Sequence, residues 1–281
     1  MRERHRLNVP GDWYIDTACI DCSAARTVAP GLIIHAEGQC VFAKQPETAE
    51  EHRMAWRARL LCPTASVRTE RLANPPDRVF PEEMTQAIYR LGYNARSSWG
   101  AHSFLIRRSA GNIMVDAPRW TKAVVSPLEA WGGLHAILLT HRDDVADAGR
   151  YAEHFGAAVF IHEADQAAAP YADRILTGRE PAPIADDLLA IPVPGHTEGS
   201  VVYLYDQRCL FTGDSLAWSF ERNDLAAFRD VCWWSWPEQK RSLRRLLAYR
   251  FEGVFAGHGG SIVLPADEMH ARLTTLVERL R

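Results

Sequence analysis

Short apolar runs separated by turn residues dominate the chain from about residue 99 onward. SFLIRR and NIMVD flank Ser109–Ala110–Gly111 and predict a β-hairpin. Further runs follow at HAILLTH, AAVFIHE, DLLAIPVPGH, SVVYLYD, RCLFTGD and GVFAGHG, and helical patterns occur near residues 145–155 and 266–280. Strands and helices that alternate, with hairpins among them, indicate a layered α/β domain rather than a purely parallel sheet.

The first third of the chain has a different pattern. Residues 8–72 form a separate unit with a helix that begins near Thr48 or Glu51 and ends before Pro63. The proline-rich stretch RLANPPDRVFPEE reads as a linker, and residues 84–92 as a short helix. We therefore expect a first domain over residues 8–72, a linker with a short helix over 73–94, and a main domain over 95–281.

Composition narrows the class of protein. The chain has 281 residues, of which 47% are hydrophobic, and a formal net charge of −3 with both signs interspersed. No basic tract favours nucleic acid, and no apolar run approaches the ~20 residues that a membrane helix needs. The start, MRERHRLNVPGDW, lacks the apolar segment of a secretory signal. We expect a cytoplasmic protein that acts on a small molecule and binds neither nucleic acid nor membrane. The sequence leaves open whether it forms homo-oligomers.

Polar side chains of one chemical type follow several of the predicted strands. An apolar strand ends and a His or Asp follows, beside Gly, Thr or another Asp, in each of four segments: ILLTHRDD, IPVPGHTEG, CLFTGDS and GVFAGHGG. They present His141, Asp143, His196, Asp214 and His258. Imidazole and carboxylate are ligands for zinc, iron or manganese, and loops at a sheet edge commonly carry functional residues.

Each of these residues also has a structural explanation. Asp143 or Asp144 could cap a helix that starts near Val145, and Asp147 could then lie in its first turn, where the helix dipole favours an anion. A single His before Gly is usually a turn residue. The metal interpretation depends on the set of strand ends rather than on any one residue. His102, His135, His154 and His162 have no comparable neighbours and are taken as ordinary.

The set resembles the metallo-β-lactamase superfamily, whose loops read T-H-x-H-x-D-H, G-H-T-x-G-S, G-D and G-H in that order. The matching segments here are residues 140–143, 195–200, 213–214 and 257–258. The resemblance implies a four-layer αβ/βα sandwich with a metal site on one edge between two sheets. It also implies a hydrolase, or less often a flavin-linked oxidoreductase, for which no second nucleotide-binding domain is visible.

Two departures from the family pattern affect the expected metal content. Asp143 stands where the family has its second histidine, and the family's Asp-His pair looks displaced to Asp147–Ala148. The metal ligands implied are His141, Asp143, Asp147, His196, Asp214 and His258. Because a ligand is missing, we expect one firmly bound divalent ion (zinc, iron or manganese) and a weak or empty second position. Asp147 and His258 would hold that second ion, or act in catalysis by orienting the nucleophile and handling protons.

The cysteines near the N-terminus resemble the cluster loop of bacterial ferredoxins, C-x2-C-x2-C-x3-C-P. Cys19 and Cys22 are present, Ala25 and Ala29 stand at the next two positions, and Cys62-Pro63 resembles the remote Cys-Pro of a single-cluster ferredoxin. The resemblance implies a small α+β ferredoxin-like domain with residual iron–sulfur positions at Cys19, Cys22 and Cys62. A three-iron cluster, Cys40 as a substitute ligand, or zinc all stay open, because a four-iron cluster needs four thiolates. We expect an empty site with free buried thiols rather than an iron–sulfur cluster.

These patterns favour a metal-dependent hydrolase that uses activated water on an ester, a thioester of the glyoxalase type or a related bond. One alternative is a non-catalytic binding or regulatory protein on a degenerate form of the same fold. A third is a ferredoxin-linked redox protein. Trp233, Trp234 and Trp236 could form the wall of a substrate pocket, or belong to the core or an interface.

Overall fold

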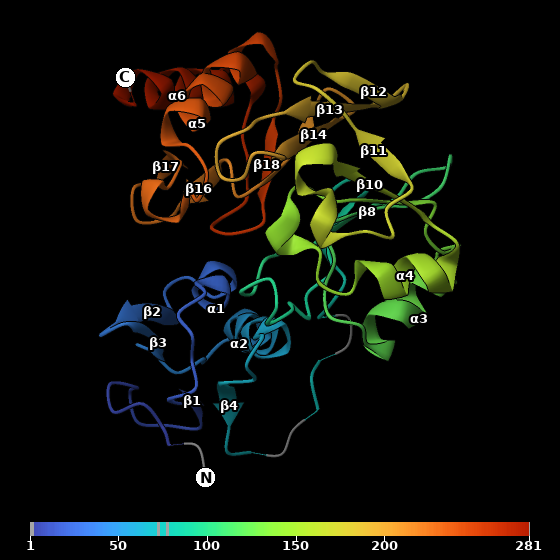
Figure 1. Ribbon diagram of the computed structural model, residues 1–281. Helices are drawn as coiled ribbons and strands as arrows, with labels where there is room; N and C mark the ends of the chain where they lie inside the picture. Colours follow the sequence, from blue (N-terminus) through green and yellow to red (C-terminus); the bar gives the residue numbers. More distant parts are fainter. Residues whose placement is uncertain (1–2, 72–73, 77–78, 281) are drawn as a thin grey trace.

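The N-terminal domain is a small α+β unit in a computed structural model that describes residues 3–71, 74–76 and 79–280 (Figure 1). Strand β1 (Trp13–Ile15) pairs antiparallel with β4 (Val67–Thr69), and β2 (Ile33–Ala36) forms a hairpin with β3 (Gln39–Phe42). Two helices, α1 (Ala24–Val28) and α2 (Ala49–Leu61), complete the unit. Its core includes the indoles of Trp13 and Trp56, whose ring centroids lie 5.3 Å apart in an edge-on arrangement.

Helix α2 has the boundaries that its sequence predicts. The Thr48 side chain accepts a hydrogen bond from the backbone N–H of Glu51, and the Glu51 carboxylate accepts one from the backbone N–H of Thr48. This reciprocal capping box satisfies two backbone donors that a helix start otherwise leaves free. The helix ends at Leu61, directly before Cys62, so it carries that thiol at its C-terminal end.

Two sheets face each other in the main domain. The first has the order β11-β10-β9-β8-β7-β6-β5 and the second β12-β13-β14-β15-β18-β19. The first sheet consists of β5 (Glu82–Thr85), β6 (Ile88–Arg90), β7 (Phe104–Ile106), β8 (Ile113–Val115), β9 (Ala136–Leu138), β10 (Ala158–His162) and β11 (Arg174–Leu176). The second consists of β12 (Ala182–Ala185), β13 (Leu188–Pro192), β14 (Val201–Tyr205), β15 (Cys209–Gly213), β18 (Gly253–Ala256) and β19 (Ile262–Val263).

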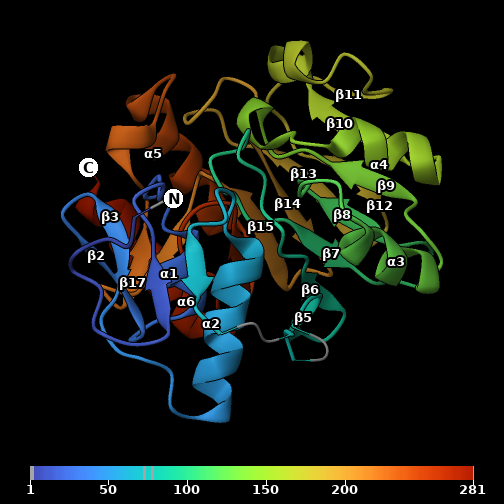
Figure 2. The same ribbon diagram turned by 90° about the horizontal axis from the view of Figure 1, so that it is seen from below.

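Helices cover the outer face of each sheet, as Figure 2 shows. Helices α3 (Lys122–Ala130) and α4 (Ala148–Phe155) pack on the first sheet, and α5 (Trp236–Arg245) and α6 (Ala266–Arg279) on the second. A short hairpin, β16 (Ala217–Ser219) with β17 (Asp224–Ala226), lies beside α6. The order helix, sheet, sheet, helix is the αβ/βα sandwich predicted from the sequence.

An aromatic cluster joins the two sheets near the strands that carry the candidate site. Phe104 of β7 contacts Phe211 of β15 and Phe255 of β18, with ring centroids 5.7 and 5.6 Å away. All three rings are almost fully buried. Tilted aromatic pairs at this distance contribute about 0.5–1.5 kcal/mol each beyond their area burial. They fix β15 and β18 against the first sheet, so the residues that follow these strands have a rigid support.

The prediction of a short helix over residues 84–92 is wrong. Residues 82–85 and 88–90 form β5 and β6, an antiparallel hairpin that continues the first sheet. Ala87 adopts a left-handed conformation, φ 67°, at the turn, and Ile88 is buried between the two sheets. Pairing with β7 and burial in the core therefore outweigh the local helical pattern. Of the predicted linker, residues 72–73 and 77–78 lie outside the described residues.

Hydrogen bonds, an ion pair and close packing join the two domains. The Arg119 guanidinium donates hydrogen bonds to the carbonyls of Leu60 and Cys62, at 3.2 and 3.3 Å. A cation at a helix C-terminus is favourable because the free carbonyls carry partial negative charge. Arg57 of α2 also pairs with Glu82 of β5 at 3.1 Å, and Gly100 packs against Cys22 and Pro63.

Within the described residues, no helix is both long enough and apolar enough to cross a membrane.

Candidate metal centre

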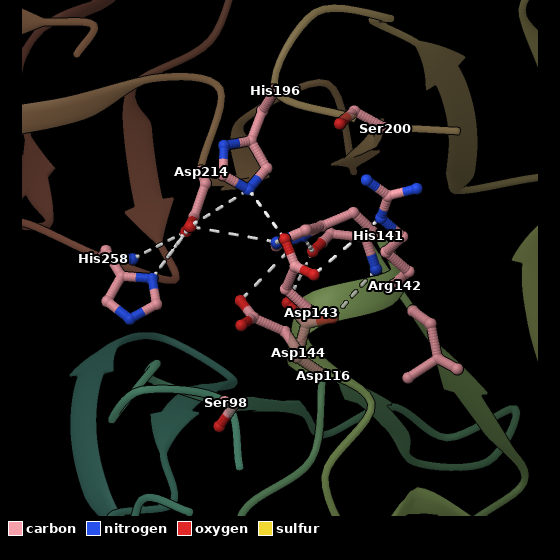
Figure 3. A network of polar contacts seen from close by, with 12 residues as sticks. Ser98, Asp116, His141, Arg142, Asp143, Asp144, His196, Ser200, Asp214 and His258 are labelled. Atoms are coloured by element: carbon pink, nitrogen blue, oxygen red, sulfur yellow. Dashed lines mark hydrogen bonds and ion pairs between the residues drawn. The ribbon is translucent and has the colours of Figure 1, made fainter. Parts of the chain in front are cut away.

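Three histidines and three aspartates converge at one edge of the sandwich, as Figure 3 shows. His141 and the short 3-10 helix Arg142–Asp144 follow β9, and His196 follows β13. Asp214 comes directly after β15, and His258 follows β18. Because the four segments end at the same edge of the sandwich, residues 117 positions apart in sequence (258 minus 141) meet in one volume.

The first ligand group consists of His141, His196 and Asp214, with Asp143 beside it. The Asp214 Oδ2 atom lies 3.8 Å from His141 Nε2 and 3.6 Å from His196 Nε2. Asp143 Oδ2 lies 3.2 Å from His196 Nε2 and 3.8 Å from His141 Nε2. The rings of His141 and His196 are perpendicular, with centroids 4.7 Å apart. Both Nε2 atoms lie within 4 Å of the same Asp214 oxygen, so they share one volume.

The second ligand group consists of Asp144, Asp214 and His258. His258 Nδ1 lies 2.9 Å from each carboxylate oxygen of Asp214. Its other nitrogen, Nε2, lies 3.4 Å from the carbonyl oxygen of Trp99. Asp214 belongs to both groups, which gives it the position of a bridging carboxylate.

The site buries polar atoms that have no hydrogen-bond partner among the described residues. Among the described residues, neither carboxylate oxygen of Asp144 has a hydrogen-bond donor, although the side chain is fully buried. Burial, followed by the charge of Asp214, raises the pKa of Asp144 well above its usual value. His141 Nε2 is also buried without a hydrogen-bond partner among these residues. Leaving such groups unpaired costs free energy, so the donor set fits a bound cation.

The pKa shifts of the other site residues show how strongly these groups interact. Burial lowers the pKa of His141 to about 4, which keeps its imidazole neutral, the form that binds metals. Burial opposes ionisation of Asp214, but the neighbouring His258 outweighs it and holds the pKa of Asp214 below its usual value. Burial likewise acts to lower the pKa of His258, and the Asp214 carboxylate outweighs it and raises that pKa to about 10.

A hydrogen-bonded relay behind His141 fixes the orientation of its ring. Thr140 Oγ1 donates to Asp116 Oδ2 at 2.9 Å, and Asp116 Oδ1 accepts from the Thr140 backbone N–H at 2.8 Å. The Thr140 oxygen, 3.0 Å from His141 Nδ1, is then an acceptor for the Nδ1 proton. This tautomer leaves Nε2 free to bind a cation, which is the usual role of residues that support metal ligands.

A second relay holds the loop that carries His196. Asp165 Oδ2 accepts hydrogen bonds from Thr197 Oγ1 and from the backbone N–H of Arg142, at 2.5 and 3.0 Å. It therefore ties the His141 loop to the His196 loop. A side chain at Gly199 would lie 2.6 Å from Asp165 Cγ, so glycine is needed at this close approach.

Asp147 lies outside both ligand groups, although the sequence assigns it to them. Its Oδ2 accepts a hydrogen bond of 2.6 Å from the backbone N–H of Trp120. It stands at the N-cap of α4, which begins at Ala148 rather than near Val145. Asp144 provides the carboxylate instead, because the 3-10 turn of residues 142–144 aims it inward. The sequence signal for Asp144 was only its place between His141 and the helix, which a cap explains equally well.

Sequence reasoning also missed the supporting residues Asp116 and Asp165 and the buried imidazole of His102. Asp116 directly follows β8, so it resembles the other strand-end aspartates, but no glycine or second polar residue marks it. The His102 backbone N–H donates to the carbonyl of Gly257 at 2.8 Å, next to His258. Burial lowers the pKa of His102 well below its usual value.

An exposed tryptophan lies beside His196. Trp233 is 63% exposed, and its ring centroid lies 6.2 Å from that of His196. The backbone N–H groups of Trp233 and Trp234 both donate to the carbonyl of His196 at 3.0 Å. The exposed indole is thus held beside the ligand group rather than in the core, which favours the pocket-wall interpretation of the sequence.

The main domain has the metallo-β-lactamase fold, and it follows a ferredoxin-type segment. Residues 15–69 match the family described as the 4Fe-4S single cluster domain of ferredoxin I. The DIM-1 metallo-β-lactamase exposed to ceftazidime superposes with a TM-score of 0.53 at 17% identity, over 71% of this chain and 96% of that one. A metallo-β-lactamase from Hirschia baltica gives a TM-score of 0.51 at 16% identity, over 70% and 96% of the two chains.

A curated relative is similar over part of the sequence. The hydroxyacylglutathione hydrolase of Acidiphilium cryptum (strain JF-5) is 33% identical over 119 residues, which is 41% of this chain and 49% of that protein. The match therefore spans about half the length of this relative. The similarity to the solved structures establishes the fold of the main domain, and the chemistry has to be argued from the site itself.

Proposed function

We propose that the protein is a metal-dependent hydrolase of small-molecule esters or thioesters. The observation that carries the proposal is the convergence of two ligand groups on Asp214, with the buried Asp144 carboxylate lacking a hydrogen-bond donor among the described residues. His141, His196 and Asp214, with Asp143, would hold one divalent ion, and Asp144 and His258 would share Asp214 in the second position. A bound divalent ion lowers the pKa of water to near neutrality and polarises a carbonyl oxygen.

The protein's own residues would orient the metal ligands, carry a proton and contact the substrate. Thr140 and Asp116 hold His141 with Nε2 toward the centre, and Asp165 joins the two loops that carry His141 and His196. When the second position is empty, His258, whose pKa Asp214 raises, would instead carry a proton near the first ion. Trp233 offers an exposed apolar surface next to His196 for the uncharged part of a substrate.

The thioester class is favoured over other bonds by similarity alone. The curated relative is named for hydroxyacylglutathione hydrolysis, and the match covers about half of it. Carboxylates are harder donors than imidazoles, so a set with Asp143 in place of a histidine favours iron or manganese relative to zinc. We retain the expectation of one firmly bound ion and a weaker second one, which Asp144 rather than Asp147 would help to bind.

The test combines metal analysis with turnover. The purified full chain, loaded separately with zinc, iron(II) or manganese, would be assayed on panels of thioesters, esters and phosphodiesters. His196→Ala should lower both metal content and turnover by at least about 100-fold, beyond the 10–100-fold typical of residues that only support ligands. His154→Gln is the control, because His154 is exposed and contacts Glu129 far from the site.

If the wild type is active and the His196→Ala variant keeps that activity, the metal mechanism is contradicted. Absence of turnover across all panels, with metal bound, would favour the non-catalytic binding protein instead.

A redox protein is the second candidate, and one contact favours it. Gly100 packs against Cys22 of the ferredoxin-type domain, and the adjacent Trp99 carbonyl lies 3.4 Å from His258 Nε2. Residues 99 and 100 thus contact both a residue of the candidate metal centre and a cysteine of the other domain. Because zinc is redox-inactive, hydrolysis by the zinc-loaded protein at the rate of the iron-loaded protein would exclude a required redox function.

A further inference from the structure

The ferredoxin-type domain has lost one thiol from its cluster motif. Cys19, Cys22 and Cys62 occupy motif positions, and Ala25 stands at the third position of the cluster loop. All six cysteines of the chain are free of disulfides. Three thiolates are one short of the set that holds a four-iron cluster. A cluster with a cysteine on every iron therefore requires a fourth thiol from outside the loop positions.

Cys40 lies where such a replacement is needed. It belongs to β3, far from the cluster loop in sequence, and its side chain is buried. One cavity is lined by the side chains of Cys19, Cys22, Cys40 and Cys62 together with Ala25. The missing thiol and the additional thiol therefore face the same volume. A buried cysteine that served only as a small apolar residue could occupy any part of the core.

Hydrogen-bond donors surround the sulfur atoms. Backbone N–H groups of Asp21 and Cys40 lie 3.5 Å from Cys19 Sγ, and that of Ser66 lies 3.2 Å from Cys62 Sγ. The guanidinium of Arg26 donates to Cys40 Sγ at 3.3 Å. Such donors stabilise thiolates rather than thiols, and hydrogen bonds to sulfur also tune iron–sulfur clusters. At Cys40 the donor is the positive charge of Arg26, and the Asp21 carboxylate that pairs with Arg26 accepts a hydrogen bond from the Cys40 thiol at 3.7 Å.

The sulfur atoms are not arranged as in a closed zinc site. Four sulfurs at ~2.3 Å from a tetrahedral zinc ion would lie about 3.8 Å apart. Among residues 3–71, 74–76 and 79–280, no three cysteine sulfurs lie within 4.8 Å of one another, although the side chains of Cys19 and Cys40 interact directly. The metal analysis below therefore separates a cluster from zinc.

We propose that Cys40 replaces the thiolate lost at Ala25, so that Cys19, Cys22, Cys40 and Cys62 together bind one four-iron cluster. This reverses the expectation from the sequence that the site is an empty relic. The inference is independent of the proposed hydrolase activity, because it concerns only the ferredoxin-type domain.

The test moves the thiol between the two positions. The full chain would be purified without oxygen, reconstituted with ferrous iron and sulfide, and compared with Cys40→Ala and with the double variant Cys40→Ala/Ala25→Cys. Alanine is used at position 40 because a serine oxygen can itself bind iron. Cys209→Ser is the matched control, since Cys209 is a half-buried thiol in β15 of the other domain. Iron, zinc and acid-labile sulfide per chain, visible absorption and electron paramagnetic resonance would be measured.

The wild type and Cys209→Ser should each contain about four irons and four sulfides in the cluster. The chelatable iron of the His141 site is removed before counting. Cys40→Ala should lose most of this iron and sulfide, and the double variant should regain it, which also shows that the domain still folds.

Four irons retained in Cys40→Ala would overturn the role of Cys40. A three-iron spectrum in the wild type, zinc in place of iron, or no metal after reconstitution would each overturn the proposed cluster.

Discussion

Replacing Asp144 with asparagine should have opposite effects on the metal-free and metal-loaded protein. In the metal-free protein the Asp144 carboxylate is fully buried, and both oxygens lack hydrogen-bond donors among the described residues. A buried unpaired polar group costs about 1–3 kcal/mol, and a charged one costs more. The asparagine amide retains the smaller cost and removes the charge. We therefore expect the metal-free variant to be more stable than the wild type by about 2 kcal/mol at neutral pH.

The pH dependence of this gain has a defined sign. Burial and the Asp214 charge raise the pKa of Asp144 above its unfolded value. The folded state therefore binds the proton more tightly, and the metal-free wild type loses stability as pH rises above the unfolded pKa, near 4. The variant has no such group, so the stability difference should be small near pH 4 and grow toward neutral pH. Thermal unfolding of chelator-treated protein measures it, at ~2–4 °C per kcal/mol.

In metal titrations the same variant should lose binding at the second position. Asp144 is one of three ligands in the group with Asp214 and His258, whereas His141 and His196 belong to the other group. We expect the weaker binding event to fall by more than about 100-fold and the tighter one to change little. Competition with a calibrated chelator measures both.

Asp147→Asn is the matched control. Asparagine keeps an oxygen to accept the hydrogen bond from Trp120, so metal binding and stability should stay near the wild-type values. Loss of the second binding event in Asp147→Asn but not in Asp144→Asn would refute the placement of these two carboxylates. A metal-free Asp144→Asn protein less stable than the wild type at pH 7 would refute the charge argument.

Three further changes test the surroundings of the site. Thr140→Val keeps the side-chain shape but removes the hydroxyl between Asp116 and His141, so metal affinity measured by chelator competition should fall ~10–100-fold with the fold retained. Gly100→Ala places a methyl 2.8 Å from Cys22 Sγ at φ +86°, and urea unfolding should show that the free energy of unfolding falls by about 1–3 kcal/mol. Gly38→Ala, at φ +78° with open space around it, should lower it less. An equal loss in both variants would contradict the domain contact at Gly100. Trp233→Ala should change the free energy of unfolding by less than ~0.5 kcal/mol because the indole is exposed, yet raise KM for an active ester or thioester without changing metal content.

The layered fold was predictable because its elements have strong local signals. The strands after residue 99 are short apolar runs bounded by turn residues, and α2 carries a capping box that the sequence itself displays. The hairpin of β5 and β6 was missed because its stability comes from pairing with β7 and from burial of Ile88 between the sheets. Neither contact is visible within a window of nine residues.

The candidate site was predictable as far as strand ends define it. His141, His196, Asp214 and His258 each follow a strand at the same edge, and order along the chain was enough to group them. The choice between Asp144 and Asp147 was not predictable from the sequence. The two residues lie about one turn apart, and the 3-10 geometry of residues 142–144 decides which side chain turns inward. Asp165 lies in the short 3-10 helix η2 (Glu163–Ala168), and folding brings this helix against the His196 loop. The sequence does not show that contact.

The same limit applies to both regions in which metal ligands are expected. At the strand-end site a carboxylate from a neighbouring position, Asp144, faces the centre that a displaced motif residue was expected to serve. In the ferredoxin-type domain a thiol from another strand, Cys40, faces the cavity that Ala25 leaves short of a ligand. A metal requires donors in a volume and is indifferent to their order in the chain, so loss of a motif residue predicts loss of binding only when no other donor faces the same volume. In each region another donor lies at the same volume. The paired substitutions at 144 and 147, and at 40 and 25, test separately whether binding is retained.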